Sequence, residues 1–370
     1  MEVVTEPRVF LNGPMQSWLN FLQQHGALGI DPHTGAIGSF TGSPDGTAPA
    51  TDFVAPLTEF GLIAASGTDA ATFLHNQLTN DVEHLKDDQI RLAGYCTPKG
   101  RLLATFLLWK TADTIYLQLP RELQPAIQKR LQMFILRAKA TLVDAGAQQV
   151  QLGLVGESAA ALLTKWFPQL PASPYAKVDG ASGSLLRLSD APAAGANAAR
   201  YLWITDEATA QAAWPELTTS LQATGADAWR LSEVRAGIPV ITLPTQEKFV
   251  PQMINFEAVG GVNFQKGCYP GQEIVARSQY LGKLKRRMMP ATVSAPSVAA
   301  GTELFAEDDP EQACGMVVNA APTTGGSACL VEIKLAAMAS VVHLGAIDGP
   351  VLQFQALPYA LADADRPDLR

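Results

Sequence analysis

The pattern of apolar residues changes at the basic run 283–287, and this change limits what the chain can fold into. Before the run, residues 139–225 alternate strand-like with helix-like stretches, a pattern typical of α+β or α/β units. After it, residues 290–370 contain only short β-like stretches separated by Gly, Pro and Asp. We therefore expect an α+β protein with a small all-β domain at its C-terminal end.

The length and composition allow several domains with a buried core. The chain has 370 residues, of which 47% are hydrophobic and 17% are charged, as in an ordered globular protein. We divide it into an N-terminal helix and linker (1–52), the first part of an α+β core (53–145), a second α+β unit (146–225), the remainder of the core (226–288) and the C-terminal β domain (289–370).

Local signals place the individual elements. Asn12-Gly13-Pro14 opens a first helix with Trp18 and Leu22 on one stripe, whereas residues 29–52 are rich in Gly, Pro and Ser and indicate a long loop. Further strands are expected at 57–65, 90–95, 102–109 and 114–119, a turn at 97–100, and helices at 70–78, 127–138, 227–238 and 272–280.

The stretch 266–273, KGCYPGQE, surrounds one thiol with groups that can make it reactive. Pro270-Gly271 suits the centre of a type II turn, because proline presets φ and glycine tolerates a positive φ. A helix can begin at Gln272, and its N-terminal dipole together with Lys266 would favour the thiolate of Cys268. The alternative is that Cys268 is a small buried apolar residue, the common fate of a free cysteine.

The same region is locally basic. Between residues 266 and 287, six basic residues and one acidic residue give a local charge of +5 in a chain of net charge −8. Such a region could attract an anionic ligand, or it could be a solvated turn between two domains. The overall charge argues against a protein dedicated to direct nucleic-acid binding.

The cysteines and the N-terminal residues indicate the compartment. The four cysteines, at 96, 268, 314 and 329, form no Cys-x-x-Cys pair, so neither a disulfide framework nor a metal-ligand spacing is present. Residues 1–10 lack the apolar core of a signal peptide, and no apolar run is long enough to cross a bilayer. We expect a cytoplasmic protein without a membrane segment.

Other common chemistries find little support. The five histidines have no metal-binding spacing, so no metal site is expected, and no glycine-rich nucleotide-binding pattern occurs. A Cys-His nucleophilic pair stays open, but the sequence does not say which histidine would reach Cys268. Residues 76–81 hold paired donors and acceptors that suit the edge of a heterocycle, or that simply cap a helix.

The segment 249–277, which contains KGCYPGQE, closely resembles the signature of the YgfZ family of folate-binding proteins, relatives of the aminomethyltransferase of the glycine cleavage system. The similarity extends, in order, to residues 73–82, 95–106, 133–144 and 229–239. It implies a GcvT-like ring of three domains with a small C-terminal β-barrel, and a central cavity for tetrahydrofolate or a one-carbon derivative of it.

The resemblance also implies site residues and partners. Cys268 is the candidate reactive thiol, and the candidate folate-binding residues are Lys266, Tyr269, Gln272, Glu273, Arg277, Arg235, Glu233, Asn76 and Asn80. Arg277 and the run 283–287 would meet the carboxylates of the glutamate tail, while Asn76, Asn80 and Gln272 would meet the pterin edge. The implied partners are iron–sulfur enzymes or their assembly factors, including a radical enzyme that modifies tRNA.

One departure separates the chain from the aminomethyltransferases. They carry an aspartate in the strand after a Gly-Gly turn, whereas the matching stretch 100–105 has no carboxylate for acid–base chemistry. Three hypotheses stay open. The chain is a folate-binding accessory protein for the assembly or repair of iron–sulfur enzymes, with Cys268 as a redox or transfer thiol; or a folate-dependent one-carbon transferase; or a folate-binding module without chemistry.

Overall fold

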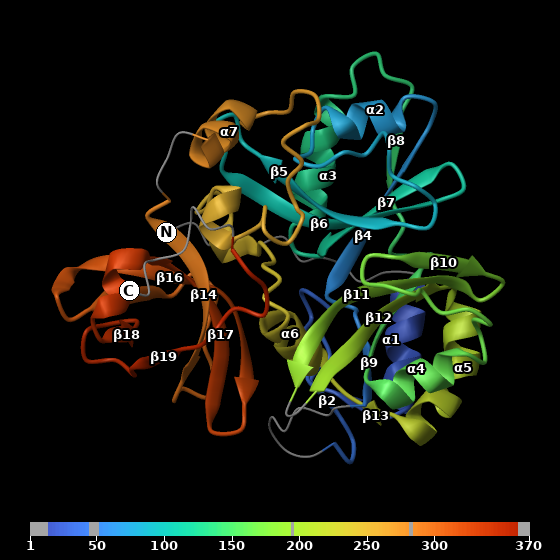
Figure 1. Cartoon of the computed structure of the whole chain (residues 1–370). Helices are drawn as coiled ribbons and strands as arrows, with labels where there is room; N and C mark the ends of the chain where they lie inside the picture. Colours follow the sequence, from blue (N-terminus) through green and yellow to red (C-terminus); the bar gives the residue numbers. More distant parts are fainter. Residues whose placement is uncertain (1–13, 44–51, 194–195, 281–283, 362–370) are drawn as a thin grey trace, which may run out of the picture.

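Three large β-sheets hold most of the strands in the structure, a computed structural model that describes residues 14–43, 52–193, 196–280 and 284–361. Figure 1 shows the sheets arranged around helix α6 (Ala226–Arg235). This helix contacts β3 and β11 of one sheet and β16 and β17 of another. The α+β class expected from the sequence is therefore confirmed.

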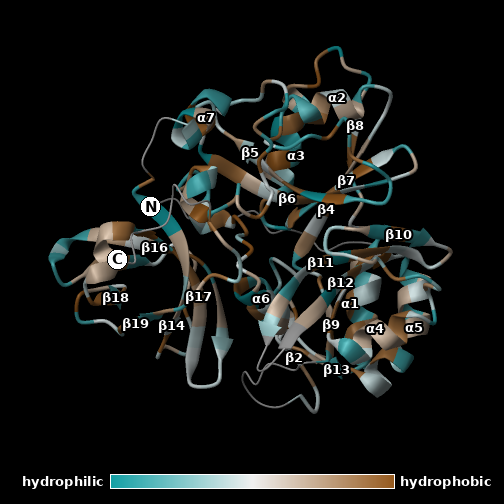
Figure 2. Ribbon diagram, viewed as in Figure 1, coloured by the Kyte–Doolittle hydropathy of each residue, from teal (hydrophilic) through white to brown (hydrophobic). Residues whose placement is uncertain are grey.

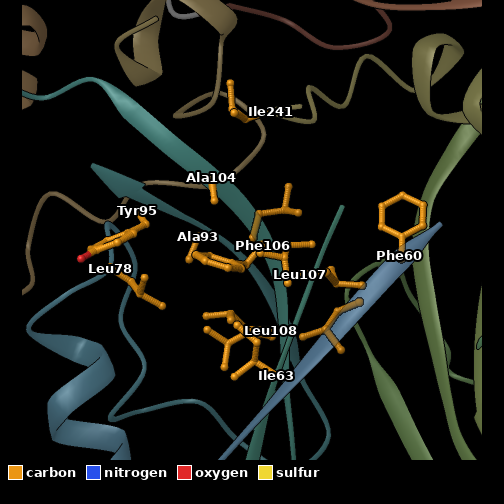
Figure 3. Packing of buried hydrophobic residues seen from close by; sticks show 14 of the residues in the cluster. Phe60, Ile63, Leu78, Ala93, Tyr95, Ala104, Phe106, Leu107, Leu108 and Ile241 are labelled. Atoms are coloured by element: carbon orange, nitrogen blue, oxygen red, sulfur yellow. The ribbon is translucent and has the colours of Figure 1, made fainter. Parts of the chain in front are cut away.

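The first sheet is antiparallel, with the strand order β5-β6-β7-β4-β8. Its strands are β4 (Phe60–Ser66), β5 (Ile90–Cys96), β6 (Leu102–Thr111), β7 (Thr114–Pro120) and β8 (Thr141–Asp144), and its helices are α2 (Ala70–His75) and α3 (Gln124–Met133). Figure 3 shows side chains of β5 and β6 packing with Leu78, which follows α2. The first eight residues of β6 are buried, which explains why the strand reads as a continuous apolar run.

The second sheet has the order β10-β11-β12-β9-β3-β13. Its strands are β3 (Phe53–Pro56), β9 (Val150–Val155), β10 (Lys177–Gly180), β11 (Gly183–Ala193), β12 (Ala196–Thr205) and β13 (Gln222–Ala223). The helices that pack with it are α1 (Pro14–Gln24), α4 (Glu157–Leu163) and α5 (Glu207–Ser220), each with hydrophobic and hydrophilic residues (Figure 2). Trp18 of α1 meets Trp214 of α5 edge to face at 6.0 Å, so the first helix belongs to this core.

The third sheet lies in the C-terminal part and has the order β18-β15-β16-β17-β14-β19. Its strands are β14 (Arg286–Val293), β15 (Glu303–Ala306), β16 (Asp309–Thr323), β17 (Gly326–Lys334), β18 (Val342–Leu344) and β19 (Leu352–Phe354). A bridge between His343 and Val351 brings the two edge strands together, so the sheet nearly closes into a barrel. The expected all-β C-terminal region is confirmed.

Most expected elements are present, with shifts at their ends. The helix expected at 70–78 stops at His75, and the helix expected at 127–138 runs from Gln124 to Met133. Part of the expected loop 29–52 is packed: β1 (Ala27–Leu28) pairs with β2 (Ser39–Phe40), and the carbonyl of Ile37 accepts from the N–H of Ala226. The 3₁₀ helices are Leu243–Thr245, Pro251–Ile254 and Leu335–Ala339.

Some expectations concern residues outside the described ranges: residues 1–13, with Asn12 and Gly13, residues 44–51, and Lys283 of the basic run. The domain boundaries stay predictions. In the described part of the chain, no helix combines the length and the apolar character needed to cross a membrane.

Candidate functional site

The KGCYPGQE motif folds as a tight turn followed by a helix. The carbonyl of Tyr269 accepts a 3.2 Å hydrogen bond from the N–H of Gln272, and Gly271 has φ = +83°, as the third residue of a type II turn requires. Helix α7 (Gln272–Tyr280) begins at once, with Glu273 in its first turn and Arg277 in its last, which suits the helix dipole. The turn and the helix expected from the sequence are confirmed.

This turn sits directly on another turn, the β5–β6 connection. There the N–H of Gly100 donates to the carbonyl of Thr97 at 2.9 Å, as expected for the turn at 97–100. A β-carbon at Gly271 would lie 2.4 Å from Thr97 O and 2.7 Å from Gly100 Cα. Only a glycine lets the two backbones approach so closely.

Lys266 ties the motif to the end of α2. Its ammonium Nζ donates to the carbonyls of His75 and Leu78, the latter at 2.9 Å, and lies 4.8 Å from the centre of the Tyr269 ring. Burial lowers the pKa of Lys266 to about 8, against the opposing effect of nearby anionic groups, Asp81 first. The lysine therefore positions the loop, because carbonyls at a helix end are its partners.

Cys268 is exposed, whereas Cys96, Cys314 and Cys329 are buried. Burial raises the pKa of both Cys96 and Cys329 to about 12, so neither forms a thiolate readily. The alternative that Cys268 merely fills the core is wrong. Among the four thiols, Cys268 is the one that a second molecule can reach.

The two asparagines near α2 differ in their surroundings. Asn76 is exposed and follows the last residue of the helix. Asn80 is buried, and its Nδ2 donates at 2.7 Å to the carbonyls of both Leu92 and Gly260. The amide of Asn80 thus joins two chain segments, and both of its hydrogens are already used.

The basic run is largely engaged within the protein. Arg286 Nη1 donates to both carboxylate oxygens of Glu332 at 2.8 Å, and the buried Arg287 pairs with Glu257. Lys285 and Arg277 are exposed. Of the described members of the run, only Lys285 is exposed, whereas Arg286 and Arg287 are paired with carboxylates of the protein.

A divided cavity lies where the three sheets meet. One part is lined by residues such as Phe106, Leu107, Tyr175 and Arg200. The other, larger part adds Val298 and Asn319 of the C-terminal region. The two parts share Phe60, Pro120, Glu233 and Val240. Val240 and Asn319 exchange two hydrogen bonds, of 2.8 and 2.9 Å, which fix the C-terminal region to the cavity wall.

Three carboxyl side chains line this cavity, those of Glu59, Glu122 and Glu233, and burial acts on two of them, Glu59 and Glu233. Glu233 Oε1 accepts from Trp229 Nε1 at 3.1 Å and lies 4.0 Å from Arg200 Nη2. Burial raises the pKa of Glu233 to about 7, and burial also raises that of Glu59. Glu59 is only 8% exposed, and neither of its carboxyl oxygens has a hydrogen-bond partner among the described residues. A ligand with N–H donors would satisfy these oxygens.

Glu233 and Arg235 do not share a site. The half-buried Arg235 lines a separate cavity with Pro290, Gln355 and Pro358. At this cavity the C-terminal segment returns to the end of α6: Tyr359 Oη donates to the carbonyl of Gly237 at 3.0 Å. A β-carbon at Gly237 would lie 2.6 Å from the Tyr359 ring.

The predicted site residues therefore fall into separate groups. Lys266, Cys268, Tyr269, Gln272 and Glu273 stand together on the motif turn and the start of α7, and Glu233 stands in the cavity. Sequence reasoning missed Glu59 and Arg200, because nothing in the local sequence marks either as buried. It also left His75 unassigned, although Nδ1 of this histidine lies 3.1 Å from Oδ1 of Asp81.

Comparisons with known proteins add a family and a fold. Three relatives are each named tRNA-modifying protein YgfZ. The protein of Colwellia psychrerythraea is 34% identical over 236 residues, 64% of this chain and 70% of its own. The protein of Escherichia coli O157:H7 is 32% identical over 249 residues, which are 67% of this chain and 74% of its own. The protein of Enterobacter sp. (strain 638) is 30% identical over 310 residues, which are 83% of this chain and 93% of its own. No family model matches the chain.

A solved structure shows the fold. The glycine cleavage system aminomethyltransferase T from Bartonella henselae aligns with a TM-score of 0.73 over 92% of this chain and 96% of its own. The sequence identity is 17%, so the likeness concerns the fold alone. The expected GcvT-like fold is confirmed.

Proposed function

The chain belongs to the YgfZ family, and from this premise we propose that it is a folate-binding accessory protein that supports tRNA modification in the cytoplasm. The observation that carries the folate part is the cavity between the three sheets, with the carboxyl groups of Glu59 and Glu233 among those on its wall. One of them, Glu59, is buried without a hydrogen-bond partner for its carboxyl oxygens among the described residues. Such a group costs free energy in the empty protein, and a donor-bearing ligand would recover that cost.

The residues present fit a reduced folate. The amino group and ring N–H groups of a pterin are donors, and Glu233 and Glu59 would accept from them. Apolar walls such as Phe106 and Leu107 would cover the ring. Bound folate would supply or accept one-carbon units, while the protein would bind and orient it.

Two further parts of the proposal concern chemistry and partners. The clients are iron–sulfur enzymes that modify tRNA, or the factors that assemble their clusters, as the family resemblance implies. The exposed thiol of Cys268 supports a redox or transfer role toward such a partner, because a thiol must be accessible to react.

A transferase is less well supported. Where aminomethyltransferases carry their aspartate, this chain has Leu102, Leu103 and Ala104, all buried in the first sheet. Aliphatic side chains cannot move a proton.

Titration of the full chain with tetrahydrofolate and its one-carbon derivatives tests the proposal. We expect saturable binding that Glu233→Gln weakens about tenfold, by analogy with a lost hydrogen bond to a charged group. The control is Glu216→Gln, an exposed carboxylate on α5. Binding that is absent, or unchanged in Glu233→Gln, would contradict it.

The tRNA part needs a cellular readout. Deleting the gene should lower the content of modified nucleosides in tRNA, measured by mass spectrometry. Wild-type protein should restore it, and Glu233→Gln should restore it poorly. Unchanged tRNA modification in the deletion strain would contradict the proposed role in tRNA modification. It would not affect the conclusion from the folate titration.

A further inference from the structure

His75, the last residue of α2, faces the backbone that carries Cys268. The residue is 7% exposed, and its Nε2 lies 3.6 Å from the position that a β-carbon would take at Gly267. Gly267 directly precedes Cys268, and consecutive Cα atoms are about 3.8 Å apart. The imidazole therefore lies next to the backbone of the residue that directly precedes Cys268.

A carboxylate orients the imidazole. Nδ1 of His75 lies 3.1 Å from Oδ1 of Asp81 and 3.9 Å from Oε2 of Glu83. An acceptor at Nδ1 keeps the ring proton there and leaves a lone pair on Nε2, the nitrogen on the side of Gly267. The hydrogen bond therefore selects the tautomer in which Nε2 can take up a proton.

Asp81 itself is held ionised. Burial alone would raise its pKa, but hydrogen bonds from the backbone and ring of His84, together with Arg91, lower it overall. The distances are 2.9 Å from His84 Nδ1 to Oδ2 and 3.8 Å from Arg91 Nη1 to Oδ2. An ionised Asp81 is thus placed to accept the ring proton at Nδ1 of His75.

Lys266 completes the arrangement without supplying the base. Its ammonium is bonded to the carbonyls of His75 and Leu78, so it fixes the motif loop against the residue that bears the imidazole. The charged and titratable groups around the imidazole are thus Asp81, Glu83 and Lys266, with His84 and Arg91 behind Asp81.

We propose that His75 is the proton acceptor for the Cys268 thiol, with Asp81 as the residue that positions it. The proton moves from Sγ of Cys268 to Nε2 of His75, which leaves a thiolate beside an imidazolium. The proposal requires a Cys268 rotamer that brings Sγ within hydrogen-bond distance of Nε2, and the exposed side chain is free to change rotamer. The proposal deepens the thiol role in the proposed function and does not depend on folate.

Alkylation of the full chain with iodoacetamide from pH 6 to 9 tests this. The S–C bond forms, the C–I bond breaks and iodide leaves, and mass spectrometry reports the modification at Cys268 alone. At pH 7 we expect His75→Gln to slow alkylation roughly three- to tenfold and to move the profile to higher pH, because fewer thiolates form. His33→Gln, at an exposed histidine outside the cluster, should match wild type.

Two outcomes would overturn the proposal: identical profiles for wild type and His75→Gln, or a slowing in Lys266→Met that His75→Gln lacks. If His75→Gln does not fold, NMR titration of His75 in wild type replaces it. Chemical blocking of Cys268 should then shift the NMR titration curve of His75. An unchanged curve would contradict the proposal. Titration of the same samples with tetrahydrofolate distinguishes this proposal from the proposed folate binding. A variant that has lost the activation of the thiol should still bind folate with unchanged affinity.

Discussion

The indole Nε1 of Trp229 donates a 3.1 Å hydrogen bond to Oε1 of Glu233, one turn further along α6. The guanidinium of Arg200 lies over the same indole, 4.6 Å from the ring centre, and its Nε donates to Ser232 at 2.9 Å. The carboxyl group of Glu233 is thereby fixed in one orientation at the cavity wall. A pre-oriented acceptor loses little conformational entropy when a ligand binds.

Glu233 should make stability depend on pH. Its pKa rises from 4.5 to about 7 on folding, so between these values the folded protein holds a proton that the unfolded chain releases. The free energy of unfolding therefore falls as pH rises through this window, by an amount on the order of 2 kcal/mol. In Glu233→Gln, denaturant unfolding at pH 5, 6 and 7 should show a shallower decline. An equally steep decline would contradict the assignment.

Removing the carboxyl group of Glu59 should stabilise the protein and weaken ligand binding. Replacing this unpartnered buried carboxyl with Met should raise the free energy of unfolding by about 1–3 kcal/mol, since a desolvated polar group disappears. The same change should weaken tetrahydrofolate binding in a calorimetric titration. Glu122→Met is a suitable comparison, because Glu122 also lines the cavity but already accepts from the N–H of Leu243. A lower free energy of unfolding in Glu59→Met, together with unchanged tetrahydrofolate binding, would contradict this prediction.

Gly271 and Gly260 form a matched pair for the contact between the two turns. Both have positive φ, +83° and +80°, but a β-carbon at Gly260 would meet nothing within 4 Å. Gly260→Ala should cost only the backbone strain, about 1 kcal/mol, whereas Gly271→Ala should cost at least about 2 kcal/mol more. Thermal unfolding of the two variants measures the difference, and equal losses would show that the turns can separate freely.

Lys266 should contribute to stability through its carbonyl bonds. Lys266→Met keeps an unbranched side chain that is one heavy atom shorter but loses the donors to His75 and Leu78, with an expected cost of about 1–3 kcal/mol. Lys99→Met, at an exposed position, should be neutral in the same unfolding experiment. Neutrality of both variants would mean that the loop is held by other contacts.

Local signals in the sequence were enough for most of the elements. The turn at Pro270-Gly271 and the start of α7 follow from residues that stand next to each other, and β6 follows from its long apolar run. The ends of α2 and α3 were less accurate, because tertiary contacts decide where a helix stops. Nothing local shows, for example, that Lys266 would bond to the carbonyls of His75 and Leu78 at the end of α2.

The grouping of site residues was harder to predict for a geometric reason. Glu233 and Arg235 are only two positions apart in α6, yet two residues turn an α-helix by about 200°, so they face different cavities. Asn80 donates to carbonyls that are 12 and 180 positions away in the chain, and local sequence patterns do not predict such long-range hydrogen bonds. Glu59 could not be recognised at all, because burial without a partner is a property of the folded molecule alone.

The contact between Tyr359 and Gly237 has a consequence for the way the protein is made. The residue that packs on the end of α6 is 122 positions further along the chain, and Asn319, which fixes the cavity wall at Val240, comes 79 positions later. Domains generally fold from the N-terminal side during synthesis. A nascent chain still on the ribosome can form the first two sheets, but it lacks the residues that finish the wall. The wall at Val240 is therefore complete only once Asn319 has left the ribosome, and the end of α6 is covered only after Tyr359 has followed.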